Sequence, residues 1–382
     1  YIHSYPNCWR TDKPILYYPL DSWFIGVSKI RTKLVSLNKE INWVPKSTGE
    51  KRFSNWLSSA NDWNLSRSRY WGIPLPIWRT IDKSETKVIG SVNELRSEII
   101  RSVNYNHMEF NLLEDFEADN MGDENYDKID LHKDTVDNII LSSNEGKPMY
   151  REKDLIDVWF DSGAMPYAQV HYPFENKDLI DKKKMFPADY IAEGVDQTRG
   201  WFYTLHVIST IVFDSISYKN VISNGLVLDK NGQKMSKRLG NSIDPFEIIS
   251  KYGPDATRWY MISNSNPWDN LKFDIDGVNE ISRKFFGTLF NTYSFFAIYA
   301  NIDEFNVNKK NIPIEKRPEI DRWIISELNR LINEVDDAFD KYDATKAARN
   351  ISIFVNDLLS NWYVRLSRRR FWKGTLRDNK LA

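Results

Sequence analysis

The stretch that decides the fold class runs from residue 189 to residue 228, DYIAEGVDQTRGWFYTLHVISTIVFDSISYKNVISNGLVL. Its first five residues are typical of a short strand that ends at Gly194. Apolar residues then recur at helical spacing, at Trp201, Leu205, Ile208 and Val212, and Asp196 is expected to cap this helix. Residues 221–228 are typical of one or two further strands. A strand, a crossover helix and a parallel strand predict an α/β doubly wound sheet.

Candidate site residues follow from that prediction, because ligands of such sheets bind beyond the carboxyl ends of the strands. The sequence therefore places them at residues 193–197 and beyond Leu228. Asn231-Gly232 is expected to turn the chain there, since both residues tolerate positive φ. A polar, cationic loop follows at residues 233–243. The next helix has a capping sequence at its start and a stop at its end: Asp244, Pro245, Glu247, Gly253 and Pro254.

Beyond about residue 281 the apolar periodicity is that of helices alone. Three apolar faces can be followed: Ile281, Phe285, Leu289, Tyr293 and Phe296; Ile320, Ile324, Leu328, Leu331, Val335 and Phe339; and Ala347, Ile351, Phe354, Leu358, Trp362 and Leu366. The segment 306–318 contains two prolines and is the expected boundary before the second face. The sequence predicts an all-α helix bundle after the α/β part.

The composition excludes several classes of protein. The 382 residues carry 52 Lys and Arg against 53 Asp and Glu, and the net charge of −1 lacks the basic excess of a nucleic-acid coat protein. A hydrophobic fraction of 41% supplies enough apolar area for two or three domains. The single cysteine, Cys8, cannot form an internal disulfide or a cysteine-rich zinc site, and no run of about 18 apolar residues predicts a membrane span. We expect a cytoplasmic protein with no zinc, no protein-held metal and no membrane partner.

Charge is segregated along the chain. Residues 98–130 hold ten acidic residues against Arg101 and Lys128, a local balance of −8. Residues 361–382 carry a balance of +6. We expect the acidic stretch to be a peripheral insertion or simply a solvated surface, and the basic end to meet a polyanion.

Residues 234–238, KMSKR, put three cations and a hydroxyl in the polar loop. Ammonium groups that approach a departing pyrophosphate stabilise the charge that develops when an α-phosphate is attacked. A solvated basic loop is the alternative interpretation.

KMSKR resembles the Lys-Met-Ser-Lys-Ser signature of class I aminoacyl-tRNA synthetases, with Arg238 in the final position. Three further stretches narrow the resemblance: residues 66–74 (SRSRYWGIP), 157–163 (DVWFDSG) and 193–202 (EGVDQTRGWF). Together they resemble the isoleucyl branch of this family, and the valyl branch is second. The likeness covers nearly the whole chain. It implies a doubly wound, Rossmann-like catalytic half followed by an all-α helix bundle, with isoleucine, ATP, Mg²⁺ and tRNA(Ile) as substrates and partners.

The resemblance also implies roles for individual residues. Lys237 matches the lysine that stabilises the transition state of pyrophosphate release, and Lys234 and Ser236 would support the ATP phosphates. The positions that would contact the aminoacyl-adenylate are Glu193, Gly194, Asp196 and Gln197. Trp159 and Trp201 match the walls of the isoleucine side-chain pocket, where flat apolar faces hold a branched aliphatic group. Without the resemblance, core packing would be the interpretation of both tryptophans.

The basic end matches the anticodon-binding bundle of the family. The implied tRNA-binding residues are Arg368, Arg369, Arg370 and Lys373, with Tyr363 and Trp372 interleaved as aromatic surfaces on which bases can stack. A solvated basic helix end is the alternative.

The five histidines do not form the His-x-Gly-His element with which the family holds ATP. We therefore expect a carboxyl-side part of a longer enzyme, inactive alone. Its expected parts are the tail of an inserted editing domain (1–50), the second half of the catalytic domain (51–252) with an acidic insertion near 84–150, a connecting helical segment (253–310) and the start of the anticodon-binding bundle (311–382). A non-catalytic tRNA-binding or assembly protein and a valine-specific synthetase are the alternatives.

Overall fold

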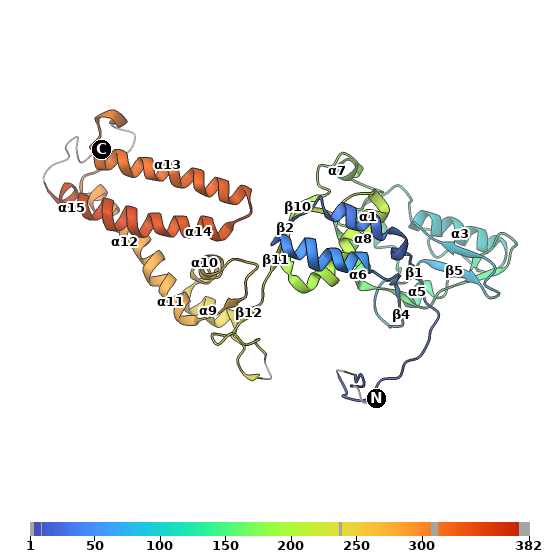
Figure 1. Ribbon diagram of the computed structural model, residues 1–382. Helices are drawn as coiled ribbons and strands as arrows, with labels where there is room; N and C mark the ends of the chain where they lie inside the picture. The colour runs from blue at the N-terminus through green and yellow to red at the C-terminus, as the bar shows by residue number, and fades with distance from the viewer. Residues whose placement is uncertain (1–3, 9, 237–238, 307–311, 374–382) are drawn as a thin grey trace. The chain divides into compact units, whose positions relative to one another are not determined.

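The computed structural model describes residues 4–8, 10–236, 239–306 and 312–373 (Figure 1). The chain divides into two compact units. Unit 1 comprises residues 1–191 and 196–221, and unit 2 comprises residues 192–195 and 222–382.

Unit 1 is built around helix α8, Trp201–Phe213. Strand β10 (Ala188–Gly194) precedes this helix and β11 (Tyr218–Asn224) follows it, and the two are neighbours in a three-stranded sheet of order β10-β11-β2, with β2 at Asn42–Val44. The predicted strand, helix and strand are therefore present. Helices α1 (Arg31–Asn38) and α2 (Ser54–Ser58) also belong to this unit, with the 3₁₀ turn η1 (Val27–Ile30) and the π segment η2 (Thr48–Phe53) before them.

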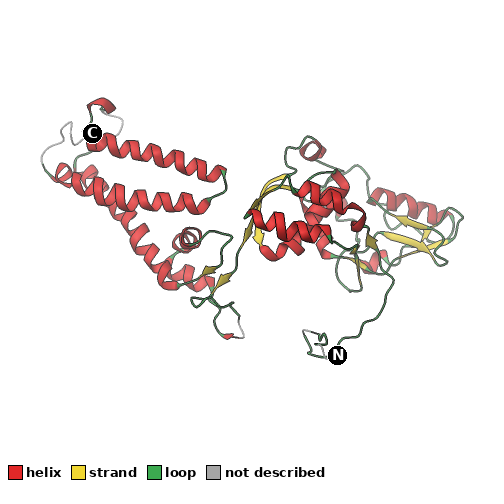
Figure 2. Cartoon of the chain, viewed as in Figure 1, coloured by secondary structure: helices red, strands yellow, loops and turns green. Residues whose placement is uncertain are grey.

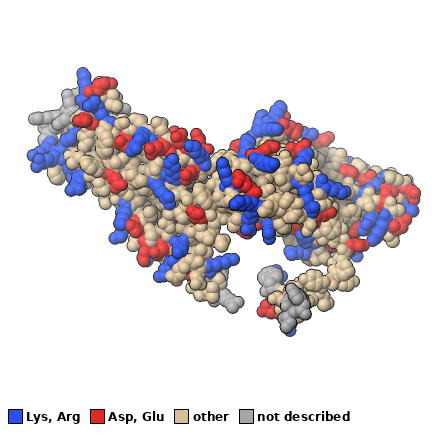
Figure 3. All heavy atoms as spheres, viewed as in Figure 1, with Lys and Arg blue, Asp and Glu red and all other residues tan. Residues whose placement is uncertain are grey.

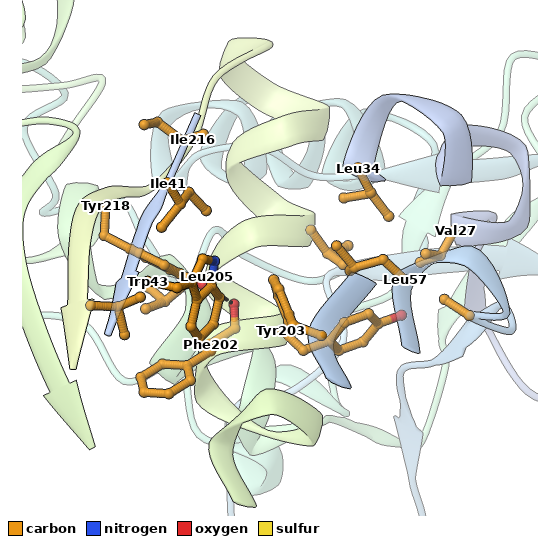
Figure 4. Packing of buried hydrophobic residues seen from close by; sticks show 14 residues of the cluster. Val27, Leu34, Ile41, Trp43, Leu57, Phe202, Tyr203, Leu205, Ile216 and Tyr218 are labelled. Carbon is orange, nitrogen blue, oxygen red and sulfur yellow. Dashed lines mark hydrogen bonds between the residues drawn. The ribbon is translucent and has the colours of Figure 1, made fainter. Parts of the chain in front are cut away.

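The core of unit 1 surrounds α8, which is buried from Phe202 to Thr210. Figure 4 shows side chains of β2, α8 and β11 pointing toward one another. The ring of Trp43 meets those of Phe202 and Tyr218 edge to face, at centroid distances of 5.7 and 6.3 Å. Val212, the last residue of the predicted apolar face, is 58% exposed near the end of the helix.

The acidic stretch lies in a compact part of unit 1 with its own sheet and core. The strands β5 (Ile77–Thr80), β6 (Thr86–Val88), β7 (Leu141–Ser142) and β8 (Pro148–Arg151) form an antiparallel sheet of order β6-β5-β8-β7. Helix α3 (Val92–Asn104) buries Leu95 and Ile99 in a cluster with Trp78 and Met149. The short helices α4 (Asp123–Tyr126) and α5 (Lys133–Val136) complete it.

The remaining elements of unit 1 carry segments of the recognised motifs. Two antiparallel pairs form, β1 (Phe24–Ile25) with β3 (Trp63–Asn64) and β4 (Ser66–Arg67) with β9 (Leu155–Ile156). Helix α6 (Val158–Ala168) packs on α8, and α7 (Lys177–Asp181) follows. A Cβ at Gly163 would lie 3.0 Å from Thr204 and 2.9 Å from Ile208, so this glycine permits the close approach of α6 to α8.

Unit 2 has one small two-stranded sheet and is otherwise mostly helical (Figure 2). Strand β12 (Val227–Leu228) pairs in parallel with β13 (Leu271–Lys272). The helices are α9 (Pro245–Tyr252), α10 (Pro254–Asn264), α11 (Ile275–Ile281), α12 (Gly287–Ile302), α13 (Glu319–Asp340), α14 (Ala344–Ile353) and α15 (Arg365–Trp372). The π segments η5 (Ser282–Phe286) and η7 (Phe354–Val364) join α11 to α12 and α14 to α15, and the 3₁₀ turn η6 spans Ile314–Lys316.

Local sequence explains the start of α9 as predicted. Asp244 accepts a hydrogen bond from the backbone N–H of Phe246, Pro245 occupies the first turn, and the helix ends at Gly253 with φ of 86°. The later helices share a core of Phe285, Ile324, Phe354 and Val355. The predicted change from α/β structure to helices alone is therefore observed.

Candidate functional site

The turn after β10 carries four of the predicted substrate-binding residues. Glu193 and Gly194 end the strand, and Asp196 and Gln197 lie in the 3₁₀ turn η3, Val195–Arg199. Glu193 is exposed and makes no hydrogen bond or ion pair with the residues that the structure describes.

The prediction that Asp196 caps the next helix was wrong. Gln197 fulfils that role, because its Oε1 accepts a hydrogen bond of 2.8 Å from the backbone N–H of Trp201. The Gln197 amide also donates to Asp196 Oδ2 at 3.3 Å. The 3₁₀ turn places the Gln197 amide oxygen, rather than the carboxylate one residue earlier, at the N-terminus of α8.

The two predicted pocket tryptophans both lie next to Gly200 in unit 1. A Cβ at Gly200 would lie 3.2 Å from the ring of Trp159 and 2.5 Å from Gln197 Oε1, so a larger residue would have to displace the Gln197 amide. Trp159 is 40% exposed and lines a cavity of about 290 Å³. The indole N–H of Trp201 donates to the carbonyl of Ser162 at 3.0 Å, and its ring packs against the core of unit 1. Trp159 faces the cavity, whereas Trp201 is not among its lining residues.

Asp157 is a site residue to which the sequence analysis gave no role. It is 4% exposed, and its Oδ2 accepts hydrogen bonds from Trp63 Nε1 at 2.9 Å and from Arg67 Nη2 at 2.6 Å. Its Oδ1 accepts from the backbone N–H of Trp159 at 3.3 Å, which caps α6. Through Arg67, Asp157 connects the motif at residues 66–74 to its own motif at residues 157–163, and both residues line the cavity. An Asp immediately before a helical run was the signal in the sequence that could have identified this cap.

The cationic loop of unit 2 is held at its base by two side chains. Asp229 accepts hydrogen bonds from the backbone N–H groups of Asn231 and Gln233, at 3.0 and 2.8 Å, and from the amide of Asn241 at 3.0 Å. These bonds, that of Gln233 foremost, lower the pKa of the Asp229 carboxyl. Gly232 has φ of 82°, as the expected turn requires.

Asn241 continues the network toward the signature residues. Its Oδ1 accepts from the backbone N–H of Ser236 at 2.9 Å, and its amide donates to the carbonyl of Lys234 at 3.2 Å. The side chain of Lys234 is exposed. Lys237 and Arg238 lie outside the described residues. A cavity of about 480 Å³ at the base of the loop is lined by Asp229, Asn241 and Lys251, among others.

The predicted tRNA-binding residues on α15 divide into two kinds. Arg368, Arg369 and Lys373 are exposed. Arg370 instead forms a bidentate ion pair with Asp321 of α13, with N–O distances of 2.6 and 2.7 Å, and Asp321 is 1% exposed.

Tyr363 belongs to the same network, since its hydroxyl donates to Asp321 Oδ1 at 2.9 Å. Burial, with the Asp321 charge in a lesser part, raises the pKa of Tyr363 to about 12. In Figure 3, basic side chains gather over the region of α15.

Among residues 4–373, leaving out the undescribed gaps, no group of three or more His, Cys, Asp or Glu side chains is placed to hold a metal ion. None of the helices in the described part of the chain has the length and apolar character needed to cross a membrane.

Comparison with known families identifies the chain's relatives. The sequence family described as tRNA synthetases class I (I, L, M and V) matches residues 11–274. The chain belongs to the class I tRNA synthetases. The anticodon-binding domain of tRNA ligases matches residues 321–382 of this class I chain. The resemblance inferred from KMSKR and the three longer motifs is confirmed.

Curated relatives of this class I synthetase chain include isoleucine–tRNA ligases. The protein from Bacteroides fragilis is 64% identical over 384 residues, which cover all of this chain and 34% of that protein. The protein from Porphyromonas gingivalis is 63% identical over 380 residues, covering all of this chain and 33% of that protein. The chain spans about a third of the length of these relatives.

Solved structures support the predicted fold of this class I chain. Methionyl-tRNA synthetase of Mycobacterium tuberculosis bound by methionyl-adenylate has a TM-score of 0.63 at 15% identity, covering 98% of this chain and 59% of that one. The LeuRS of Agrobacterium radiobacter K84 agnB2, in a ternary complex with tRNA and LeuAMS, has a TM-score of 0.57 at 18% identity, covering 80% and 37%. The Rossmann-like α/β catalytic half followed by helices is confirmed.

Proposed function

We propose that this chain is part of an isoleucine–tRNA ligase. In the first step, the isoleucine carboxylate attacks the α-phosphate of ATP, forming isoleucyl-adenylate and releasing pyrophosphate. In the second, the acyl group is transferred to the terminal ribose of tRNA(Ile). The observation that carries this proposal is 64% identity over the whole chain to a curated isoleucine–tRNA ligase. The reaction belongs to translation, and we place it in the cytoplasm.

We assign the phosphate chemistry to the cationic loop. Lys234 and Ser236 would support the ATP phosphates, and Lys237 would stabilise the charge that develops on pyrophosphate. Mg²⁺ would arrive bound to those phosphates, because this cation keeps few protein ligands and suits substrate phosphates. The hydrogen bonds that Asn241 makes at Ser236 and Lys234 support this assignment, since they fix the start of the loop.

We assign the aminoacyl end of the substrate to the turn after β10 and to Trp159. The Glu193 carboxylate would bind the substrate ammonium, and its lack of any partner among the described residues leaves it available. Gly194, Asp196 and Gln197 would contact the adenylate. Trp159 and Trp201 would bound the aliphatic side chain, and the exposure of the Trp159 ring to a cavity supports its part.

We assign tRNA binding to the basic end of the helical region. Arg368, Arg369 and Lys373 would contact phosphates, and their exposure supports this role. Arg370 would act through Asp321, by holding α15 against α13. We also propose the domain limits. Residues 1–50 would be the tail of the editing domain, 51–252 the second half of the catalytic domain with its insertion near 84–150, 253–310 the connecting helical segment and 311–382 the start of the anticodon-binding bundle.

A hybrid enzyme tests the function. In the ligase of Bacteroides fragilis, the matching third of the sequence is replaced by this chain, and isoleucine-dependent exchange of pyrophosphate into ATP is measured. We expect exchange with isoleucine and little with valine. Lys237→Ala should lower the exchange rate by a factor on the order of 10², with isoleucine affinity nearly unchanged, because the lysine acts on the transition state.

Lys230→Ala is the matched control, because Lys230 is an exposed cation in the turn just before the loop, outside the signature. It should leave exchange unchanged. A folded hybrid that performs no exchange would favour the binding or assembly alternative, and one that prefers valine would favour the valine-specific alternative. Equal rates for Lys237→Ala and the parent hybrid would remove the role assigned to Lys237.

A further inference from the structure

A second cavity, of about 550 Å³, lies entirely within unit 1 and has no part in the proposed reaction. Its walls come from residues 73–78, from the insertion near 84–150 and from α6, with Arg151, Ile156 and Phe174 completing them. Most of its lining is apolar, including Leu75, Trp78, Ile89, Leu95, Val136 and Phe160. Its volume is in the range of cavities that enclose drug-sized molecules.

Helix α6 separates this cavity from the one that Trp159 lines. Residues at the start of this helix line different cavities. Asp157 and Trp159 line the smaller cavity, and Phe160 and Asp161 line the larger one. The two cavities share no lining residue. The larger cavity is therefore a separate place in the unit, not an extension of the candidate substrate pocket.

Two ionisable residues line the larger cavity, Arg151 and Asp161, and only Arg151 has its charge compensated. The guanidinium of Arg151 is paired with Asp137 and donates to the carbonyls of Leu75 and Asp154 at 3.2 and 3.1 Å. Its side chain is almost fully buried. Arg151 thus has little capacity left for a ligand.

Asp161 is in the opposite situation. Its carboxyl is partly buried and makes no hydrogen bond or ion pair with any described residue. Burial, followed by the charge of Asp157, raises the pKa of Asp161, so the environment disfavours its charged form. A cation placed in the cavity would relieve both effects, since it would pair with the carboxylate and shield it from Asp157.

We propose that the cavity between α6 and the acidic insertion binds an apolar organic amine, whose ammonium pairs with Asp161 and whose hydrocarbon body fills the apolar walls. The same charges disfavour related ligands. An anion would meet an unpaired carboxylate, and a zwitterionic amino acid would bring a second carboxylate that the saturated Arg151 cannot bind. The ligand class is therefore an amine whose carboxyl group is absent or esterified.

Four probes with one indole body test this selectivity on the whole chain: tryptamine, indole, tryptophan and indole-3-acetate. Affinities are measured by ligand-observed NMR titration at pH 7 and fixed ionic strength. We expect tryptamine to bind about tenfold more tightly than indole, as one partly buried charge pair allows. Tryptophan and indole-3-acetate should bind more weakly than indole.

Two variants separate the charge from the apolar walls. Asp161→Asn should bring the affinity of tryptamine to within about twofold of that of indole. Ala168→Phe adds bulk at a lining position that is exposed and should weaken tryptamine and indole alike. Asp178→Asn is the control, because Asp178 is an exposed carboxylate on α7 outside the cavity, and it should change none of the four affinities.

The proposal is overturned if tryptamine does not bind at millimolar concentration, or binds no better than indole-3-acetate. It is equally overturned if Asp161→Asn keeps the preference for tryptamine. These outcomes are independent of the proposed ligase function, because no measurement uses ATP, isoleucine or tRNA.

Discussion

The turn after β10 and the cationic loop both carry residues that we assign to the same reaction, but they rest on different supports. The turn leads directly into α8, which is buried from Phe202 to Thr210 in the core of unit 1. The loop is held by hydrogen bonds that Asp229 accepts and that Asn241 makes. Its side chains Met235 and Ile243 are only partly buried where they pack against the nearby core. We therefore expect a substitution in the core around α8 to lower the stability of unit 1, and a substitution at the base of the loop to alter the loop alone.

The largest effect is expected from emptying the core beneath the turn. Phe202 is fully buried and packs against Trp43 and Tyr218. Phe202→Ala should lower the free energy of unfolding by about 3 to 5 kcal/mol, through lost burial and the cavity left behind. Equilibrium urea unfolding measures it. Ile211→Ala, at an exposed position of the same helix, is the control and should cost much less; equal losses would show that α8 is not the support.

A buried histidine of α8, His206, makes the stability of unit 1 sensitive to pH. His206 Nε2 contacts the carbonyl of Leu34 at 2.9 Å, which assigns the proton to Nε2, and Nδ1 has no partner among the described atoms. Burial lowers the pKa of His206 to about 4, from 6.5. Below pH 6.5 the unfolded chain therefore takes up a proton that the folded chain refuses until about pH 4.

Stability should fall across that pH window, and the contribution of His206 should reach about 3 kcal/mol at its acid end. Above pH 6.5 the residue should contribute no pH dependence. His206→Gln retains a donor for Leu34 and removes the titration. Urea unfolding at pH 7.5, 6, 5 and 4 should give a shallower decline for this variant; parallel curves for variant and parent would refute the assignment.

A change at the basic end of α15 should have an effect of intermediate size, because one of its arginines belongs to a buried ion pair. Arg370→Ala would leave Asp321 buried with the Tyr363 hydroxyl as its one side-chain partner among the described residues. We expect a loss of about 2 kcal/mol in unfolding free energy, less than for a fully buried pair because the Arg370 side chain is 21% exposed.

Arg368→Ala is the matched control. The Arg368 side chain is exposed on the same helix, so the free energy of unfolding should change by less than about 0.5 kcal/mol. In the hybrid ligase, Arg368→Ala should instead weaken tRNA binding and reduce its salt dependence by the equivalent of about one phosphate contact. If the two variants were equally destabilising, the division of the basic residues into two kinds would be wrong.

The sequence predicted the elements of the fold well where local signals agree. The strand ending at Gly194, the turn at Gly232 and the helix that begins after Asp244 all depend on nearby residues, and all three are observed. The apolar faces beyond residue 281 likewise predicted helices. Family motifs then identified segments that no composition or periodicity could distinguish from ordinary core.

What the sequence could not predict were partners distant along the chain. Asp157 bonds to Trp63 and Arg67 some 90 residues earlier, and Arg370 of α15 pairs with Asp321 of α13, 49 residues earlier. Periodicity contains no information about such pairs. The error at Asp196 has another origin, because a 3₁₀ turn shifted the start of α8 and gave Gln197 the hydrogen bond that a regular N-cap would have made.

The smallest effect is expected beneath the loop. Asn241→Ala removes the bonds to Ser236, Lys234 and Asp229, while the nearby core of Ile248, Tyr260 and Phe273 stays intact. A net loss of about 1 kcal/mol should be confined to the loop, so the Ser236 amide should exchange with solvent about fivefold faster at unchanged global stability. Hydrogen exchange measured by NMR reports both quantities.

Asn231→Ala is the control, since the Asn231 side chain is exposed in the turn just before the loop and makes no hydrogen bond with the described residues. Global unfolding of unit 2 by Asn241→Ala would mean that loop and core are one cooperative structure, and the contrast between the two supports would then fail.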